Sequence, residues 1–191
     1  MSAGSRIHVL GISGSLRRGS FNTGLLRAAS GVLPEGMELE IGEIGAIPLY
    51  NADVEAAGPP ESVARLKERV AAADALLFAT PEYNYSIPGV LKNAIDWVSR
   101  PVATSPLAGK PIAMMGAGGG LGTGRSQYHL RQVAVFTNML PINKPEVMVA
   151  NAAQRFDQNG NLTDDSVKEQ IRALLDALAA WVRRLRGELS A

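Results

Sequence analysis

The stretch ALLFA at residues 75–79 has no polar residue at any alternate position. A strand of this composition is buried on both faces, which is typical of the centre of a parallel sheet covered by helices. Parallel neighbours require long crossover connections, and a helix is the usual crossover. The rest of the chain is therefore constrained to supply further strands separated by helices.

The sequence repeats one order of features: an apolar run, a turn rich in glycine or proline, and a segment with helical spacing. This order predicts a doubly wound α/β fold with a five-stranded parallel sheet. The strands are expected at residues 7–12, 37–44, 75–79, 111–115 and 146–150, and the helices at about 23–33, 61–73, 88–100, 125–139 and 164–185. No internal repeat or long linker divides the chain, so residues 1–191 are expected to form a single domain, with the longest irregular stretches at 45–60 and 151–163.

The chain contains no cysteine and only two histidines, His8 and His129. Disulfides and Cys-ligated metal centres are thereby excluded, and no metal site is expected. The chain has 19 Lys and Arg residues and 18 Asp and Glu residues, a net charge of +1. It therefore lacks the excess of positive charge that indicates nucleic-acid binding. No apolar run suits a signal peptide or a membrane span, so a cytoplasmic protein without a membrane partner is expected. The side chains alone therefore offer little redox or nucleophilic chemistry.

Three loops of unusual composition follow the first, third and fourth expected strands, at residues 13–22, 80–87 and 116–124. In an open parallel sheet, ligands bind beyond the carboxyl ends of the strands. We therefore expect these three loops to form the ligand site.

Residues 13–22 (SGSLRRGSFN) combine glycines with hydroxyl, amide and guanidinium groups immediately before a helix. Unpaired N–H groups and the helix dipole favour an anion there, so a terminal phosphate is the expected ligand. The spacing fits neither a P-loop, which needs Lys and Ser/Thr after its second glycine, nor the G-x-G-x-x-G fingerprint. In the alternative interpretation, Ser20 or Asn22 only caps the helix and the two arginines are solvated.

Residues 80–89 (TPEYNYSIPG) place two tyrosines and an asparagine at the end of a strand. They form a possible rim for a flat heteroaromatic ring, with Tyr83 or Tyr85 covering one face. Alternatively, this is a rigid turn whose tyrosines pack on the next helix. Glu82 fits both interpretations, because its carboxylate can cap backbone N–H groups or face a ligand.

Residues 116–124 (GAGGGLGTG) hold six glycines in nine positions. Backbone of this kind can pass flush against a planar ligand with its amides free to donate. The alternative is a flexible surface loop. Arg125 follows directly and could face an anionic substrate, the phosphates of a nicotinamide nucleotide, or solvent.

The stretches 14–22 and 80–97 together resemble the NADPH-dependent FMN reductase family, which has a flavodoxin-like fold. Within it, the chain is most similar to the bacterial chromate/quinone reductases, which also carry runs like YHLRQ at 128–132 and NKPE at 143–146. The resemblance covers nearly the whole chain. Relatives often have a hydroxyl residue just after the fourth strand, where this chain has Ala117 between glycines. Only backbone contact is expected there.

The resemblance implies that the FMN phosphate is held within 15–22 and that the ring rests against 82–85, with Ala117 and its glycine neighbours opposite. No side chain is expected to be catalytic, because FMN carries the chemistry. The implied cofactor-binding residues are Ser15, Leu16, Arg17, Arg18, Gly19, Ser20, Phe21, Asn22, Pro81, Glu82, Tyr83, Asn84, Tyr85, Ser86, Ala117, Gly118 and Gly119.

The implied activity is reduction of quinones, chromate or free flavin through FMN, with NADPH or NADH as the electron donor. The alternatives are a flavodoxin-like electron carrier without a nicotinamide site, and an azo-compound or arsenical reductase of the same fold. Flavodoxins are strongly acidic, whereas this chain is nearly neutral, which favours the reductase.

A homo-oligomer, either a dimer or a tetramer, is also implied, because a ring bound only at loop tips would be widely exposed. Helices 87–100 and 125–139 are the expected contact surfaces. Their apolar residues Leu91, Trp97, Val98, Val133, Phe136 and Leu140 would serve either an interface or the core. The residues expected at the substrate or subunit contact are Arg100, Arg125, Tyr128 and Glu146.

Overall fold

The strand ALLFA lies in the middle of a parallel sheet, and all five of its residues are buried. The computed structural model describes residues 6–188, so residues 1–5 and 189–191 of the expected domain lie outside the described part. The strands are β1 (Ile7–Ser13), β2 (Met37–Gly42), β3 (Ala75–Ala79), β4 (Pro111–Ala117), β5 (Leu140–Pro141) and β6 (Val147–Val149). Their order is β2-β1-β3-β4-β5, with β6 also paired to β4, and every pair is parallel.

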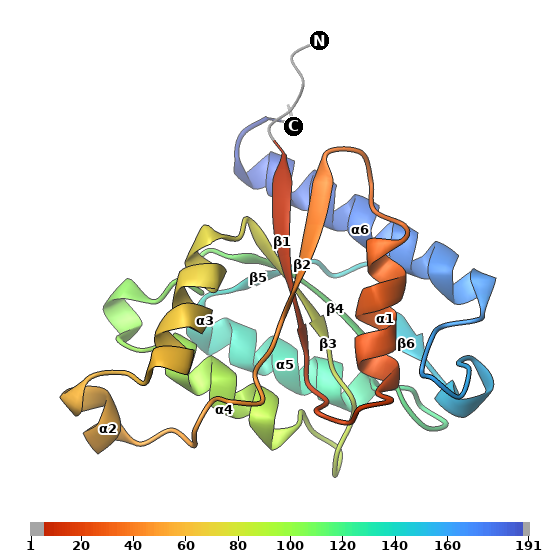
Figure 1. Ribbon diagram of the computed structural model, residues 1–191. Helices are drawn as coiled ribbons and strands as arrows, with labels where there is room; N and C mark the ends of the chain where they lie inside the picture. Colours follow the sequence, from red (N-terminus) through yellow and green to blue (C-terminus); the bar gives the residue numbers. More distant parts are fainter. Residues whose placement is uncertain (1–5, 189–191) are drawn as a thin grey trace.

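Helices cover both faces of the sheet, with α1 and α6 on one face and α3, α4 and α5 on the other (Figure 1). The helices are α1 (Phe21–Ser30), α2 (Ala52–Ala57), α3 (Glu61–Ala72), α4 (Gly89–Val98), α5 (Gly124–Thr137) and α6 (Asp165–Leu185), with 3₁₀ turns at Val102–Thr104 and Ala152–Gln154. The expected doubly wound parallel α/β sheet is confirmed.

Side chains alternate between two cores because successive residues of a strand point to opposite faces. In β3, Leu77 belongs to the core beneath α1 and α6, whereas Leu76 and Phe78 belong to the core beneath α3, α4 and α5. Leu91, Trp97 and Val98 of α4 are buried in the second core. Of the two alternatives left open for these three residues, a subunit interface or the core, the structure shows the core.

The expected fifth strand, residues 146–150, is β6, and the structure adds one short strand that was not expected, β5. β5 pairs with the start of β4 and β6 with its end. Leu140, expected in a helix, lies in β5, because α5 ends at Asn138 in the left-handed conformation (φ 54°). The first helix starts at Phe21 rather than near residue 23, because Ser20 caps it by accepting a hydrogen bond from Thr23 N (3.3 Å). The stretch 45–60, expected to be irregular, contains α2.

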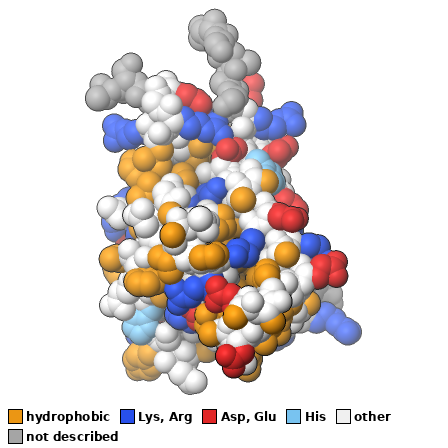
Figure 2. Space-filling model, turned by 90° about the vertical axis from the view of Figure 1, so that its left-hand side faces the viewer, with side chains coloured by type: hydrophobic (Ala, Val, Ile, Leu, Met, Phe, Trp, Pro, Cys, Tyr) orange, Lys and Arg blue, Asp and Glu red, His pale blue; other side chains and the backbone are white. Residues whose placement is uncertain are grey.

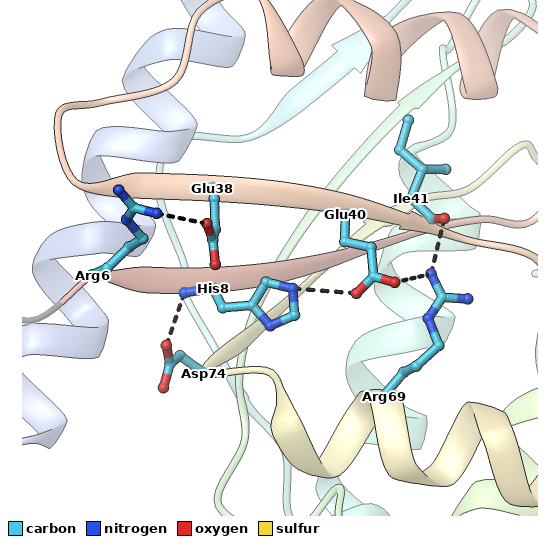
Figure 3. A network of polar contacts seen from close by, with 7 residues as sticks. All are labelled: Arg6, His8, Glu38, Glu40, Ile41, Arg69 and Asp74. Atoms are coloured by element: carbon cyan, nitrogen blue, oxygen red, sulfur yellow. Dashed lines mark hydrogen bonds and ion pairs between the residues drawn. The ribbon is translucent and has the colours of Figure 1, made fainter.

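Polar contacts hold the edge strand β2 against β1 and α3 (Figure 3). Glu40 of β2 contacts His8 Nε2 (3.2 Å) and Arg69 Nη2 (2.7 Å), and Arg69 Nη2 also donates to Ile41 O (3.0 Å). His8 N donates to Asp74 Oδ2 (2.8 Å). His8 is thus part of a structural network. Within residues 6–188, no group of three or more His, Asp or Glu side chains is arranged to hold a metal ion, and no helix is long and apolar enough to cross a bilayer.

Candidate functional site

The three loops singled out by the sequence leave the sheet side by side at its carboxyl edge. The first residue after each strand donates a backbone hydrogen bond to the neighbouring strand or its extension. These bonds run from Gly14 N to Ala79 O (2.9 Å), from Thr80 N to Met115 O (3.0 Å) and from Gly118 N to Val149 O (3.0 Å). In Figure 1 this edge is at the bottom, opposite the start of β1 and the end of α6. We name the loops by the strand that each follows: the β1 loop (13–22), the β3 loop (80–87) and the β4 loop (118–123).

The β1 loop brings a set of anion donors to the N-terminus of α1. The first-turn N–H groups of Phe21 and Asn22 precede any intrahelical acceptor, as at the start of every α-helix. The exposed guanidinium of Arg17 lies over the Phe21 ring, with Cζ 4.9 Å from the ring centroid, and Arg18 is exposed. Ser20 is buried and caps α1. Capping and anion binding are therefore compatible here. The Ser20 hydroxyl accepts the capping bond and can still donate its own O–H, and both guanidiniums and the first N–H groups are left to donate to an anion.

The side chain of Asn22 points to the β4 loop. Its Nδ2 donates to Ala117 O (3.0 Å), and its Oδ1 accepts from Ala117 N (3.0 Å). Both residues are buried, so this pair of bonds is shielded from water. The amide of Asn22 thus ties the β1 loop to the end of β4, and any contact of Asn22 with an anion is left to its backbone N–H.

The β3 loop is a tight hairpin. Tyr83 and Ser86 exchange both backbone hydrogen bonds (3.0 Å each), and the two residues between them, Asn84 and Tyr85, have positive φ angles of 50° and 68°. Two successive positive φ values define a type I′ turn. Tyr83 is 50% exposed and Tyr85 is 65% exposed. The alternative in which both tyrosines pack on the following helix is therefore wrong, and the rings stand at the open edge.

Glu82 turns its carboxylate toward the N-terminus of α5 and away from the open edge. Oε2 accepts from Arg125 N (3.0 Å) and Ser126 N (3.3 Å), while Oε1 accepts from Arg125 Nε (2.5 Å) and also pairs with Nη2 of the same guanidinium. Burial raises the pKa of Glu82, but the bonds from Arg125 and Ser126 outweigh it and leave the pKa below the ordinary 4.5. The carboxylate is therefore ionised at neutral pH.

Arg125 is held on two sides. Besides its pair with Glu82, its guanidinium Cζ lies 3.6 Å from the centroid of the Tyr85 ring, which is contact distance for a stacked cation. The bond to Glu82 raises the pKa of Arg125 further. The side chain remains 38% exposed, so part of this fixed cation faces solvent at the edge.

The β4 loop is ordered by backbone bonds rather than flexible. Gly122 N donates to Gly119 O (2.9 Å), and the chain after β6 closes over the loop through Asn151 N to Gly119 O (3.0 Å). At Gly119 and Gly120 an added Cβ would meet no atom within 4 Å, so the backbone there borders open space. This arrangement suits the close approach of a flat ligand.

Sequence reasoning missed a buried polar cluster beneath the β3 and β4 loops. Thr80 and Ser126 share a hydroxyl contact (3.0 Å), and Ser126 Oγ donates to Pro81 O (2.9 Å). Gln127 Nε2 donates to Thr123 Oγ1 (3.0 Å) and to Val147 O (2.9 Å). The available signal was the unbroken polar run that opens the fourth expected helix, 125–139, since a polar residue on a buried helix face must find partners.

The four residues expected at a substrate or subunit contact separate into three places. Arg125 lies at the edge. Tyr128 OH donates to Glu146 Oε1 (3.3 Å), so these two pair within the chain, and Lys144 also pairs with Glu146. Arg100 lies just beyond the far end of α4, about 15 Å along the helix axis from its start, with Cζ 5.9 Å from the Tyr50 ring centroid.

Two cavities flank the β1 loop at this edge. One, of about 270 Å³, lies between the β1 loop and residues 41–45. The other, of about 410 Å³, is lined by Phe21, Gly118, Gly119 and residues 151–154. A cavity of about 510 Å³ lies elsewhere, between residues 141–144 and α6, near the start of β4. We place the ligand site at the carboxyl edge, because the anion donors and exposed rings gather there.

The donor set at this edge fits a ligand with a phosphate at one end and a flat ring at the other. Guanidiniums, a hydroxyl and helix N–H groups suit a dianionic phosphate. The hairpin tyrosines and the open glycine backbone suit a planar ring with a polar rim. FMN has both parts.

The family model of NADPH-dependent FMN reductases matches residues 7–154. The chain is 58% identical to an NAD(P)H-dependent FMN reductase of Pseudomonas aeruginosa over 95% of this chain and 98% of the relative. It is 49% identical to an NAD(P)H:quinone oxidoreductase of Solanum tuberosum, over 98% of this chain and 99% of the relative. Among solved structures, it is similar to the flavoenzyme NAD(P)H:(acceptor) oxidoreductase FerB of Paracoccus denitrificans, with a TM-score of 0.82, 33% identity, and coverage of 93% and 98% of the two chains.

Replacing Asn22 by alanine is expected to lower the free energy of unfolding by about 2–4 kcal/mol, because it leaves the buried N–H and C=O of Ala117 unpaired. Urea unfolding of the protein without cofactor measures this loss, and hydrogen exchange at the Ala117 amide should accelerate. Asn159→Ala, at an exposed turn, is the control, with an expected change below about 0.5 kcal/mol. Equal stabilities for the two variants would show that the Asn22 bonds do not hold the edge together.

Proposed function

The chain belongs to the NADPH-dependent FMN reductase family, and from this premise we propose how its carboxyl edge holds FMN and which acceptors it serves. The protein is an FMN-dependent oxidoreductase that uses NADPH or NADH to reduce quinones or flavins. Bound FMN supplies the redox chemistry, accepting electrons from the nicotinamide and passing them to the acceptor. Chromate is proposed as a further acceptor.

The observation that carries the assignment is the meeting of an anion-donor loop, an aromatic hairpin and a glycine-rich loop at one edge. Ser15, Arg17, Arg18 and Ser20, with Leu16 and Gly19 between them and the N–H groups of Phe21 and Asn22, form the proposed phosphate site. Two features support this site: the positive end of the α1 dipole and the guanidiniums of Arg17 and Arg18. Neither guanidinium forms an ion pair with an acidic side chain within residues 6–188.

The ring is proposed to lie between the β3 hairpin and the β4 loop. Residues 81–86 (Pro81, Glu82, Tyr83, Asn84, Tyr85 and Ser86) supply one wall, with backbone amides and the Asn84 side chain toward the polar rim of the ring. Ala117, Gly118 and Gly119 supply the other wall through backbone alone. Since the turn at Asn84 and Tyr85 is fixed by its hydrogen bonds, this wall is formed before the ring binds.

Arg125 is proposed to contact the electron acceptor. Quinone oxygens gain negative charge as they are reduced, and chromate is an anion, so both acceptors are stabilised by a fixed cation. The partly exposed guanidinium beside the hairpin meets this need. Arg100 is too far along α4 to share the same acceptor within one chain, so we assign it to a subunit contact. A cytoplasmic location is proposed because NADPH and NADH are available there.

A reductase and an electron carrier differ in their response to the nicotinamide. Mixed with FMN and NADPH without oxygen, the protein is expected to bleach the flavin absorbance within seconds, and a quinone should restore it. Parallel reactions with NADH, chromate and an azo dye rank donors and acceptors by kcat/KM. Flavin that stays oxidised with both nicotinamides while dithionite bleaches it would identify a carrier.

Arg17→Ala combined with Ser20→Ala is expected to weaken FMN binding about a hundredfold or more. Each change removes a donor to the phosphate, and such charged hydrogen bonds contribute about 1.5–3 kcal/mol each. Fluorescence titration with FMN measures the affinity, and riboflavin, which lacks the phosphate, should bind wild type and variant alike. Arg172→Ala on the exposed side of α6 is the control. An unchanged FMN affinity in the double variant would refute the phosphate site.

We propose a homodimer at least, and a tetramer built from two dimers, in which a neighbouring chain covers the ring. On α5, Tyr128, Val135 and Phe136 are 56%, 82% and 69% exposed and lie on one helical face that starts beside the ligand edge. On the side of the molecule shown in Figure 2, the apolar side chains are interspersed with charged ones. The α5 face is therefore the proposed contact, with Tyr128 and Glu146 near it.

Light scattering at micromolar concentration is expected to give at least twice the chain mass of 20.2 kDa. Val135→Lys with Phe136→Lys should dissociate the assembly, because two buried cations would then face each partner. Glu169→Lys, on the exposed face of α6, should leave the mass unchanged. A fully active wild type at the mass of one chain would reject the proposed assembly.

A further inference from the structure

Glu82 joins the β3 hairpin to the start of α5, and its contacts differ from those expected of a residue that faces a ligand. Its side chain is only 8% exposed, and all four of its contacts come from the first residues of α5. Both carboxylate oxygens are therefore occupied by protein donors.

The start of α5 needs such an acceptor. Thr123, at its N-cap position, makes no side-chain capping bond, because its hydroxyl accepts from Gln127 instead. Glu82 takes the vacant role from a different loop by accepting the Arg125 and Ser126 N–H groups. A carboxylate is favoured at this position by the positive end of the helix dipole.

The side chain of Arg125 connects Glu82 to Tyr85 at the tip of the β3 hairpin. One edge of the guanidinium is held by Glu82, and one face lies against the Tyr85 ring at 3.6 Å. Tyr85 has a φ of 68°, a left-handed backbone conformation that is unfavourable for such a residue and persists only where surrounding contacts stabilise it. The stacked cation is one of those contacts.

We propose that Glu82 is a positioning residue, whose carboxylate fixes the Arg125 guanidinium against Tyr85 and thereby sets the place of the acceptor-binding cation. Glu82 itself touches neither FMN nor acceptor through its side chain. The effect on turnover rests on the proposed contact between Arg125 and the acceptor, while the fixing of Arg125 is a property of the chain alone. A fixed cation helps more than a mobile one, because its orientation is set before the acceptor gains charge.

The test compares wild type, Glu82→Gln, Arg125→Gln and the double variant, with Glu61→Gln as the control for loss of an exposed ion pair on α3. In protein without FMN, the Arg125 Nε–H signal is identified by nuclear magnetic resonance through its loss in Arg125→Gln. Its hydrogen exchange is expected to be at least tenfold faster in Glu82→Gln and unchanged in Glu61→Gln.

In the FMN-loaded enzyme, Glu82→Gln is expected to lower kcat/KM for benzoquinone about tenfold, as Arg125→Gln does, because the cation acts on charge that the quinone gains during reduction. The FMN affinity should change less than threefold. The double variant should be no worse than Arg125→Gln, because the two residues act through one cation. Additive losses, or a tenfold weaker FMN affinity in Glu82→Gln alone, would overturn the proposal by showing a direct role for Glu82.

Two further outcomes distinguish a failure of the proposed acceptor contact from a failure of the positioning role of Glu82. An unchanged kcat/KM for benzoquinone in Arg125→Gln would refute the acceptor contact proposed above, and the Nε–H exchange rate then decides by itself whether Glu82 positions Arg125. Should Glu82→Gln not fold, Glu82→Asp replaces it, since the shorter carboxylate keeps the charge. Exchange at Arg125 should then lie between wild type and an unprotected guanidinium, and wild-type exchange in Glu82→Asp would overturn the proposal.

Discussion

The whole ligand edge depends on the parallel hydrogen-bond ladder of β1, β3, β4 and β6. Where β1, β3 and β4 end, the neighbouring strand still has an unused carbonyl group. The backbone N–H of the first loop residue donates to that carbonyl and so continues the ladder by one bond before the chain turns away. Loops far apart in the sequence thus start at the same level. In a parallel sheet all carboxyl ends lie at one edge. The β3 loop and the β4 loop therefore meet the β1 loop there, although the three are far apart in the sequence.

A buried charge then links two of these loops. An ionised carboxylate with 8% exposure is costly unless its oxygens are satisfied, and the start of α5 supplies backbone donors and a guanidinium together. The same guanidinium stabilises a tyrosine in an unfavourable backbone conformation. Removing the Glu82 side chain takes the acceptor from Arg125 and from the first N–H groups of α5, so the hairpin and α5 depend on each other.

Close backbone approach fixes the other side of the site. A Cβ at Gly24, on the buried face of α1, would overlap Gly160 O, and one at Gly116 would overlap the hydroxyl of Thr123. Arg27 of α1 adds a bond from Nη2 to Gly160 O (2.8 Å). The turn at residues 157–161 therefore rests directly on α1, and it holds the helix whose N-terminus faces the proposed phosphate.

The sequence by itself determined the parallel sheet, because ALLFA can be buried only between two layers, and it determined which three loops meet, because strand direction sets where they end. It also indicated the loop proposed to hold the phosphate, because the donors of that loop are neighbours in the chain. It could not show that Asn22 binds Ala117, 95 positions away, or that Glu82 binds Arg125, 43 positions away. Nor could it show that residues 140–141 add a further short strand beside the start of β4. These features depend on which side chains the folded layers bring within hydrogen-bond distance, and only the tertiary structure decides that, since a carboxylate or amide has the same local preferences whether it meets a ligand or another loop.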